Sequence, residues 1–316
     1  MSIIRVCEEG CGRCRSILAR DASPEGVYHI FASMLDQLGH GFLENTLTAA
    51  IASQSDPGSG LSSSPFAASP ATSPSHPLQL LNIVHQASNV MSLVLQHFLG
   101  VVMPAVSASI NERAHCTMAL EKLQASLESR ISTLLSHALS STMLHTSSLL
   151  KQQGKADFKV RDHKKDGPSD GVAMPTSTCS GVVEYLSSVS RAISVCLDGQ
   201  NLENALGQLG TSLYLTLLKH FKSLSVSQGL GGMQLMRDVS EYQSWARSLG
   251  TLSLHTKFDL LRHIANMHTF PPHNLQALIE ETSLSKLSGV SLLELLRMRT
   301  DFKPSWLGTI IFIDRK

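Results

Sequence analysis

Apolar residues recur every three or four positions through much of this chain, which is the spacing of one face of an α-helix. The clearest run comprises Leu120, Leu123, Leu127, Ile131, Leu134 and Ala138. Similar spacing occurs over 202–217, 236–249 and 254–268. These runs predict four helices. Gly250 should end the third, because glycine readily adopts the left-handed conformation that closes a helix, and Pro271 and Pro272 should end the fourth.

Further helices are predicted over 78–106, 179–197 and 286–299. No stretch alternates with period two for long enough to indicate a strand. A short connection, Asp198–Gln200, favours antiparallel neighbours, and the apolar stripes are wide enough to contact two other helices. We therefore predict an all-α fold, an elongated stack of antiparallel helical bundles.

Two polar segments divide the helical stretches. The first, 53–77, is rich in Ser and Pro, and the second, 152–175, contains several Gly and Pro residues. Segments of this composition bury too little apolar surface to offset the entropy lost on ordering. The expected organisation is an N-terminal helical segment at 1–52, a disordered insert at 53–77, a helical bundle segment at 78–151, a polar basic hinge loop at 152–175, a C-terminal helical bundle at 176–303 and a divergent tail at 304–316.

The overall charge is nearly balanced, with 26 Lys and Arg against 25 Asp and Glu in 316 residues. This balance gives no general basic surface for nucleic acid. The most apolar stretch, 91–107, is interrupted by Gln96, His97 and Pro104, so it is interpreted as a core helix. With no signal peptide evident at the N-terminus, we expect a soluble cytoplasmic protein with reduced cysteines.

Three cysteines near the N-terminus, Cys7, Cys11 and Cys14, have a spacing that could hold zinc. A closed structural site needs a fourth ligand, and no second cluster follows at the spacing of a zinc finger. Ordinary thiols are the favoured interpretation, and no metal or cofactor is expected. A zinc module is kept as a competing class, which metal analysis of the purified protein would test.

Gly229, Gly231 and Gly232 resemble a phosphate-binding loop only superficially, because helices flank them and no Lys follows. They are better interpreted as a tight turn between helices. No carboxylate pair typical of glycosidases stands out in the sequence. We therefore expect no catalytic residue and no enzymatic activity.

A basic cluster at 151–165 includes four candidate contacts for acidic lipid, Lys159, Arg161, Lys164 and Lys165. Aspartates are interspersed among them, which favours a solvated hinge. The alternative function is an acidic-lipid-binding helical adaptor that uses this loop.

A series of short motifs resembles one family in order and spacing. In the first half these are Arg13-Cys14, the helix at 28–52 and the motif at 84–89; in the second half they are 156–159, 198–201, 206–210, 231–233, Asp238-Val239, Glu241-Tyr242 and 297–302. The string resembles the C-terminal portion of the exocyst Sec-ten subunit, also called exocyst complex component five. The resemblance covers roughly Arg13–Phe302. The long N-terminal helices of the family have no counterpart in this sequence, so the chain is expected to be a fragment or a short form.

The resemblance implies a non-catalytic subunit of the complex that tethers secretory vesicles to the plasma membrane in exocytosis. It implies other exocyst subunits as partners, the Sec-fifteen subunit above all, and small GTPases around them. It also implies peripheral association with the plasma membrane and with secretory vesicles. The matched residues Gly231, Gly232, Met233, Asp238 and Tyr242 are family signature positions with an expected structural role.

Overall fold

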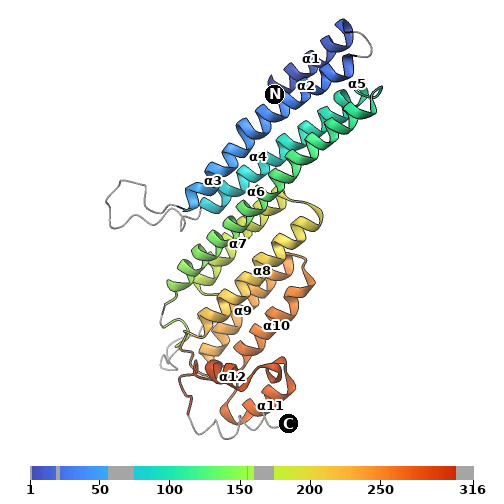
Figure 1. Ribbon diagram of the computed structural model, residues 1–316. Coiled ribbons are helices and arrows are strands. Elements are labelled where there is room, and N and C mark those ends of the chain that lie inside the picture. The colour runs from blue at the N-terminus through green and yellow to red at the C-terminus, as the bar shows by residue number, and fades with distance from the viewer. Residues whose placement is uncertain (1, 19–21, 56–74, 155, 160–173, 304–316) are drawn as a thin grey trace, which may run out of the picture. The chain divides into compact units, whose positions relative to one another are not determined.

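The structure, a computed structural model, describes residues 2–18, 22–55, 75–154, 156–159 and 174–303. In these ranges every named element is a helix, and the one β-bridge, between Val226 and Arg299, is isolated. The all-α prediction is confirmed for this part of the chain (Figure 1). The chain divides into two compact units, Met1–Ser141 (unit 1) and Thr142–Lys316 (unit 2).

The described residues of unit 1 form six α-helices and two π-helical segments. The α-helices are α1 (Ser2–Ile17), α2 (Ser23–Leu35), α3 (Asn45–Ser55), α4 (His76–His97), α5 (Met103–Ala105) and the first part of α6 (Ile110–Lys151); the π-helical segments are η1 (Asp36–Glu44) and η3 (Phe98–Val102). Helix α1 packs against α2 and α4, and the rings of Phe31 and Phe98 stack with centroids 5.5 Å apart. Leu120, Leu123, Leu127 and Leu134 are buried, which confirms the predicted face of α6.

The helices beside the predicted insert extend further than the sequence suggested. Helix α3 continues to Ser55, and α4 begins at His76, with Pro77 in its first turn. Proline is tolerated there because the first-turn amides have no partner within the helix. Residues 56–74, the centre of the predicted disordered insert, lie outside the described residues.

One helical stretch in the described part of the chain, His76–Ala105, is long and apolar enough to cross a membrane by length and composition. Its mean hydropathy reaches 1.3, and 28% of that window is buried. The buried side chains include Leu80, Leu81, Val84 and Val94, which recur on one face of α4. That face belongs to the core of unit 1, whereas Leu93, Leu95 and Leu99 are exposed. The interpretation of residues 91–107 as a core helix therefore stays a prediction.

Unit 2 is centred on four long helices, α7 (Ser177–Cys196), α8 (Gly199–Phe221), α9 (Leu230–Ser248) and α10 (Leu252–Asn266). Both α8 and α9 pack against α7 and against α10. The predicted apolar face of α8 is confirmed, because Leu209, Leu213 and Leu217 are fully buried. Shorter helical elements follow, namely η5 (Pro272–Asn274), α11 (Leu275–Glu281), η6 (Ser283–Lys286) and α12 (Gly289–Leu296).

The predicted helix ends are right in one case and wrong in another. Gly250 follows α9 with φ of +71°, which confirms its predicted role. The helix expected over 286–299 is only α12, because the backbone at Ser288 is extended and its side chain accepts a hydrogen bond from the Ser291 amide. This N-cap starts the helix at Gly289.

Candidate functional site

Two signature glycines on α9 lie where other backbone segments cross the helix. A Cβ on Gly231 would collide with the Phe158 carbonyl oxygen. A Cβ on Gly232 would lie 2.5 Å from the carbonyl carbon of His268 and 2.8 Å from the amide nitrogen of Thr269. Gly229, just before α9, has φ of +78°. The interpretation of these glycines as a turn with close backbone approach is therefore confirmed.

Asp238 joins α9 to the start of α7. Its carboxylate accepts hydrogen bonds from the Thr176 amide at 2.8 Å and the Thr176 hydroxyl at 2.6 Å. The Thr176 side chain in turn accepts a hydrogen bond from the Cys179 amide and so caps α7. Burial raises the pKa of Asp238, whereas the hydrogen bonds from Thr176 and Gln234 oppose that rise. This arrangement fixes the start of α7.

The two other signature residues differ in exposure. Tyr242 is 2% exposed, and burial raises its pKa well above the usual value. Met233 is 50% exposed and is the one signature side chain that lies on the surface. Four of the five predicted signature residues are thus buried in unit 2, and Met233 is half-exposed.

The basic candidates lie at the edge of what the structure describes. Lys159 is exposed, whereas Arg161, Lys164 and Lys165 lie outside the described residues. Both flanks of residues 160–173 are held on α9 or the turn before it. The Phe158 carbonyl accepts a hydrogen bond from the Ser227 amide at 2.9 Å, and the Met174 carbonyl accepts one from Gln234 at 3.0 Å.

The N-terminal cysteines are divided between the core and its edge. Cys7 and Cys11 lie on one buried face of α1 with their sulfurs 4.0 Å apart, and His97 Nε2 is 3.3 Å from Cys7 Sγ. Cys14 is only partly buried. A hydrogen bond to Cys11 raises the pKa of Cys7, followed in importance by burial. The described residues contain no group of three His, Cys, Asp or Glu residues arranged to hold a metal ion.

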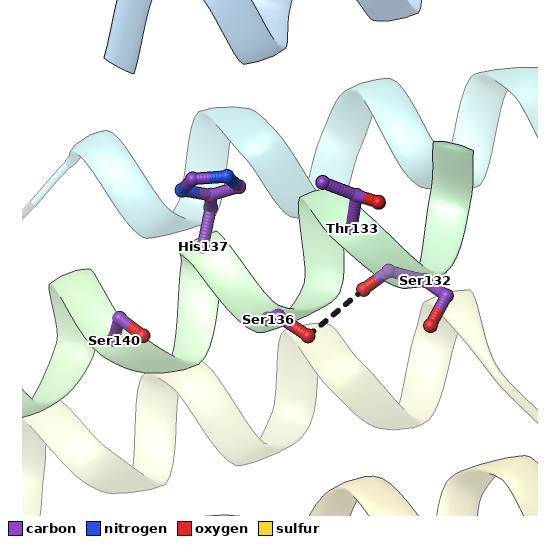
Figure 2. Close-up of a pocket in the computed structure, with 5 residues that line it drawn as sticks. All are labelled: Ser132, Thr133, Ser136, His137 and Ser140. Carbon is purple, nitrogen blue, oxygen red and sulfur yellow. Dashed lines mark hydrogen bonds between the residues drawn. The ribbon is translucent and has the colours of Figure 1, made fainter. Parts of the chain in front are cut away.

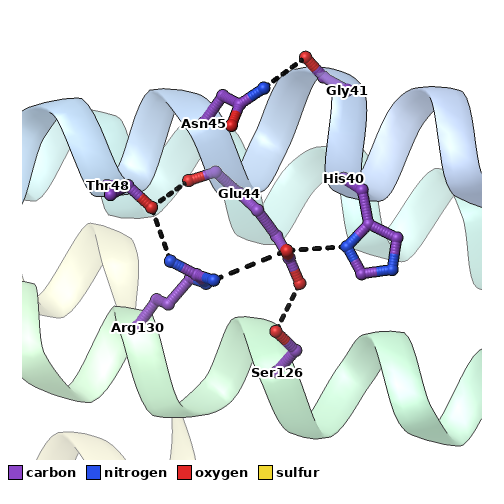
Figure 3. A network of polar contacts seen from close by, with 7 residues as sticks. All are labelled: His40, Gly41, Glu44, Asn45, Thr48, Ser126 and Arg130. Atoms are coloured by element: carbon purple, nitrogen blue, oxygen red, sulfur yellow. Dashed lines mark hydrogen bonds and ion pairs between the residues drawn. The ribbon is translucent and has the colours of Figure 1, made fainter.

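A polar network, not evident from the sequence, ties η1 to α6 inside unit 1 (Figure 3). The Glu44 carboxylate accepts hydrogen bonds from Ser126 and from Arg130, the latter at 3.5 Å, and lies 2.7 Å from His40 Nδ1. Arg130 also donates to the Thr48 hydroxyl at 2.5 Å. The Ser126 hydrogen bond lowers the pKa of Glu44, and burial opposes it. Glu44 and Ser126 are more than 80 positions apart in the sequence. The spacing of residues along the chain therefore gives no indication of this contact.

Replacing Glu44 with Gln should lower the free energy of unfolding by about 1–2 kcal/mol at pH 7, because a charged acceptor is lost from a nearly buried network. The folded-state pKa of Glu44 is lowered, so its contribution is present above the ordinary carboxyl pKa of about 4.3. It is lost as the pH falls through the folded-state pKa. Urea unfolding at pH 7 and in acid measures both effects. Glu121→Gln, an exposed carboxylate on α6, is the control and should change neither.

A hollow of about 260 Å³ on α6 is polar (Figure 2). Its described lining consists of Ser132, Thr133, Ser136, His137 and Ser140. The Ser136 hydroxyl donates to the Ser132 carbonyl at 3.1 Å, so it serves its own helix. These lining residues include one histidine, His137, and no carboxylate or thiol.

A larger hollow of about 520 Å³ lies between α1 and α2. Its apolar lining consists of Ile3, Val6, Cys7, Ile30 and Met34. Val6 is 67% exposed, so this apolar surface is not covered by the described part of the chain. Sequence reasoning did not identify it. The signal was present, because Ile3 and Val6 are exposed apolar residues on α1 beside the buried Cys7.

Comparison with known proteins gives one consistent family. Residues 1–309 match the family described as exocyst complex component Sec10-like, alpha-helical bundle. The chain is 27% identical over 232 residues to exocyst complex component 5 of Dictyostelium discoideum, and 22% identical over 309 residues to that of Homo sapiens. These matches cover 73% and 98% of this chain. They cover only 23% and 41% of the two relatives, so the chain spans less than half of their length.

A solved structure of Myo2-GTD in complex with Mmr1 is also similar to this chain. It aligns with 98% of this chain and 79% of that chain, at 13% sequence identity and a TM-score of 0.49.

Proposed function

The chain belongs to the exocyst complex component Sec10-like helical-bundle family, and on that premise we propose that it is a non-catalytic part of the exocyst that helps to tether secretory vesicles to the plasma membrane. The observation that carries this proposal is the family match over residues 1–309. The all-α fold supports it, because packed helices leave long exposed faces for partner helices. The buried signature residues Asp238 and Tyr242 then act by holding α9 in place.

In this proposal the chain works as a scaffold. Weak contacts to several partners combine through the high effective concentration inside one complex. The partners are other exocyst subunits, with the Sec-fifteen subunit as the first candidate, and small GTPases act around them. The expected location is cytoplasmic, with peripheral association at the plasma membrane and secretory vesicles.

Binding of the purified chain to purified Sec-fifteen subunit tests the finer part of the proposal. A stable complex should elute earlier than either protein in size-exclusion chromatography. If the chain binds other exocyst subunits and not this one, the partner assignment is wrong and the scaffold function stands. If it is folded and binds none of them, the scaffold function is wrong.

A second candidate function, binding to acidic lipid, is favoured by the exposure of Lys159 and by the way both flanks of residues 160–173 are held at α9. We predict that charge reversal of the four candidates, Lys159, Arg161, Lys164 and Lys165, lowers binding to vesicles that contain acidic lipid by about tenfold or more. Each basic residue near such a surface contributes about 1 kcal/mol. Vesicle co-sedimentation at low and physiological salt measures this effect.

The matched control reverses four exposed basic residues elsewhere, Lys122, Arg191, Arg247 and Lys286. Equal loss of binding in both variants would indicate only a general charge effect. Unchanged binding after reversal of the four candidates would remove the lipid-binding function and leave the scaffold proposal untouched.

A further inference from the structure

The apolar hollow between α1 and α2, here called the α1–α2 groove, is a candidate binding site for a helix. Along α1 its lining includes Ile3, Val6 and Cys7, and opposite them lie Ile30 and Ser33 on α2 and Gln37 on η1, at intervals of three and four residues. A third helix packs against two others through this spacing, because its side chains enter the gaps between successive turns. The site where a Cβ on Gly10 would lie is 3.2 Å from the Ile30 side chain, which shows how closely the two walls approach there.

The exposure of the apolar residues in the groove favours binding of another protein segment there. Val6 is 67% exposed and Ile3 is 40% exposed. Farther along α1, Ile17 continues the same face. An exposed apolar stripe beside the buried side chains of a helix typically marks contact with another helix. The polar lining residues Ser33 on α2 and Gln37 on η1 are uncharged, which allows an apolar face to enter between the walls.

The charged residues along the outer edge of the groove indicate the charge expected on the bound segment beside its apolar face. Glu25 and His29 on α2 and Asp36 at the start of η1 are all exposed, at intervals of four and seven residues. Glu25 lies 3.9 Å from His29, with both side chains about 70% exposed. This edge is acidic, and complementary charge on a partner would be basic.

We propose that the α1–α2 groove binds an amphipathic helix of another exocyst subunit, whose apolar face fills the groove and whose Lys or Arg residues lie along the Glu25–Asp36 edge. This proposal rests on the proposed function and makes it more specific, since it names the contact surface and the chemistry of the partner. Helix-in-groove binding of this kind combines apolar anchors with charges at the rim.

Photo-cross-linking in the assembled complex tests the proposal. A photoreactive amino acid replaces Val6 in the full chain, and a second version carries it at Ile110, which is 79% exposed in the same unit. Position 6 should cross-link to one exocyst subunit, within a helical segment that has apolar residues in steps of three and four and flanking Lys or Arg. Position 110 should not give this product.

Three results would overturn the proposal. In the first, position 6 cross-links to a second copy of this chain. In the second, it cross-links to a segment without apolar residues in steps of three and four and flanking Lys or Arg. In the third, it gives no product that position 110 does not also give. If any of these occurs while the chain still co-purifies with exocyst subunits, the groove assignment is wrong and the proposed function stands. If the chain co-purifies with none of them, both are wrong.

Substitutions give an independent measurement. Val6→Glu should weaken retention of the cross-linked subunit at least about tenfold, as expected for a buried charge at an apolar anchor. Ile110→Glu, equally exposed in unit 1, should leave retention unchanged. Glu25→Lys combined with Asp36→Lys should weaken retention at low salt, and by less at high salt because screening removes the edge contribution. Unchanged retention in Val6→Glu, with an unchanged thermal transition, would contradict the proposal.

Discussion

Gly232→Ala should destabilise unit 2 by about 2–4 kcal/mol, because overpacking that backbone atoms cannot relieve costs more than a flexible side chain would. The new Cβ would meet the His268 carbonyl group and the Thr269 amide, which lie at the end of α10. Both are backbone atoms, so α9 and the segment after α10 would have to separate. Urea unfolding followed by circular dichroism measures the loss as a lower midpoint with an unchanged slope.

Gly181→Ala is the matched control for that experiment. Gly181 lies in α7 of the same unit, and a Cβ there would have no atom within 4 Å. Alanine has the higher helix propensity, so this variant should be unchanged or more stable by up to about 1 kcal/mol. If Gly232→Ala proves as stable as Gly181→Ala, then α9 does not approach the end of α10 as described.

Arg299→Ala should cost about 2–4 kcal/mol, because it removes a fully buried guanidinium and leaves its hydrogen-bond acceptors unpaired. The Arg299 side chain is 0% exposed and pairs with the Asp301 carboxylate through two hydrogen bonds of 2.9 and 2.8 Å. It also donates to the carbonyls of Met267 and Phe270, at 2.7 and 2.8 Å. The guanidinium therefore joins the end of α10 to the segment after α12. Without it, the carboxylate and both carbonyls would lose these hydrogen bonds.

Arg299→Lys separates charge from geometry. Lysine keeps the positive charge but cannot make the two parallel bonds to a carboxylate, so it should recover only part of the loss. The Arg299 hydrogen bonds lower the pKa of Asp301. Their contribution is therefore present above the ordinary aspartate pKa of about 3.9 and lost as the pH falls through the folded-state value. Full stability in Arg299→Lys would show that charge alone suffices.

The helical faces could be predicted from sequence because burial there follows one simple rule. Leu209, Leu213 and Leu217 on α8 are spaced so that all three point the same way, and all three are buried. No comparable rule places the polar contacts. Thr176 and Asp238 are 62 residues apart, and only the packing of α7 against α9 brings them together.

The π-helical turns also escaped prediction, for a geometric reason. Helical periodicity assumes 3.6 residues per turn, whereas η1 and η3 have wider turns that shift the following residues around the helix. In η1, Gly39 lies against the Leu123 side chain of α6, at a position where a Cβ would collide with it. Such a contact depends on a helix more than 80 residues downstream, and the local pattern of apolar residues does not contain it.

Co-purification is the direct test of whether this chain is part of the exocyst. The tagged chain is expressed in cells, recovered under mild conditions, and the bound proteins are identified by mass spectrometry, with the destabilised Gly232→Ala variant as the control. We expect the wild-type chain to recover other exocyst subunits and the variant to recover markedly less of them. A folded wild-type chain that recovers none of them would contradict the proposed exocyst function.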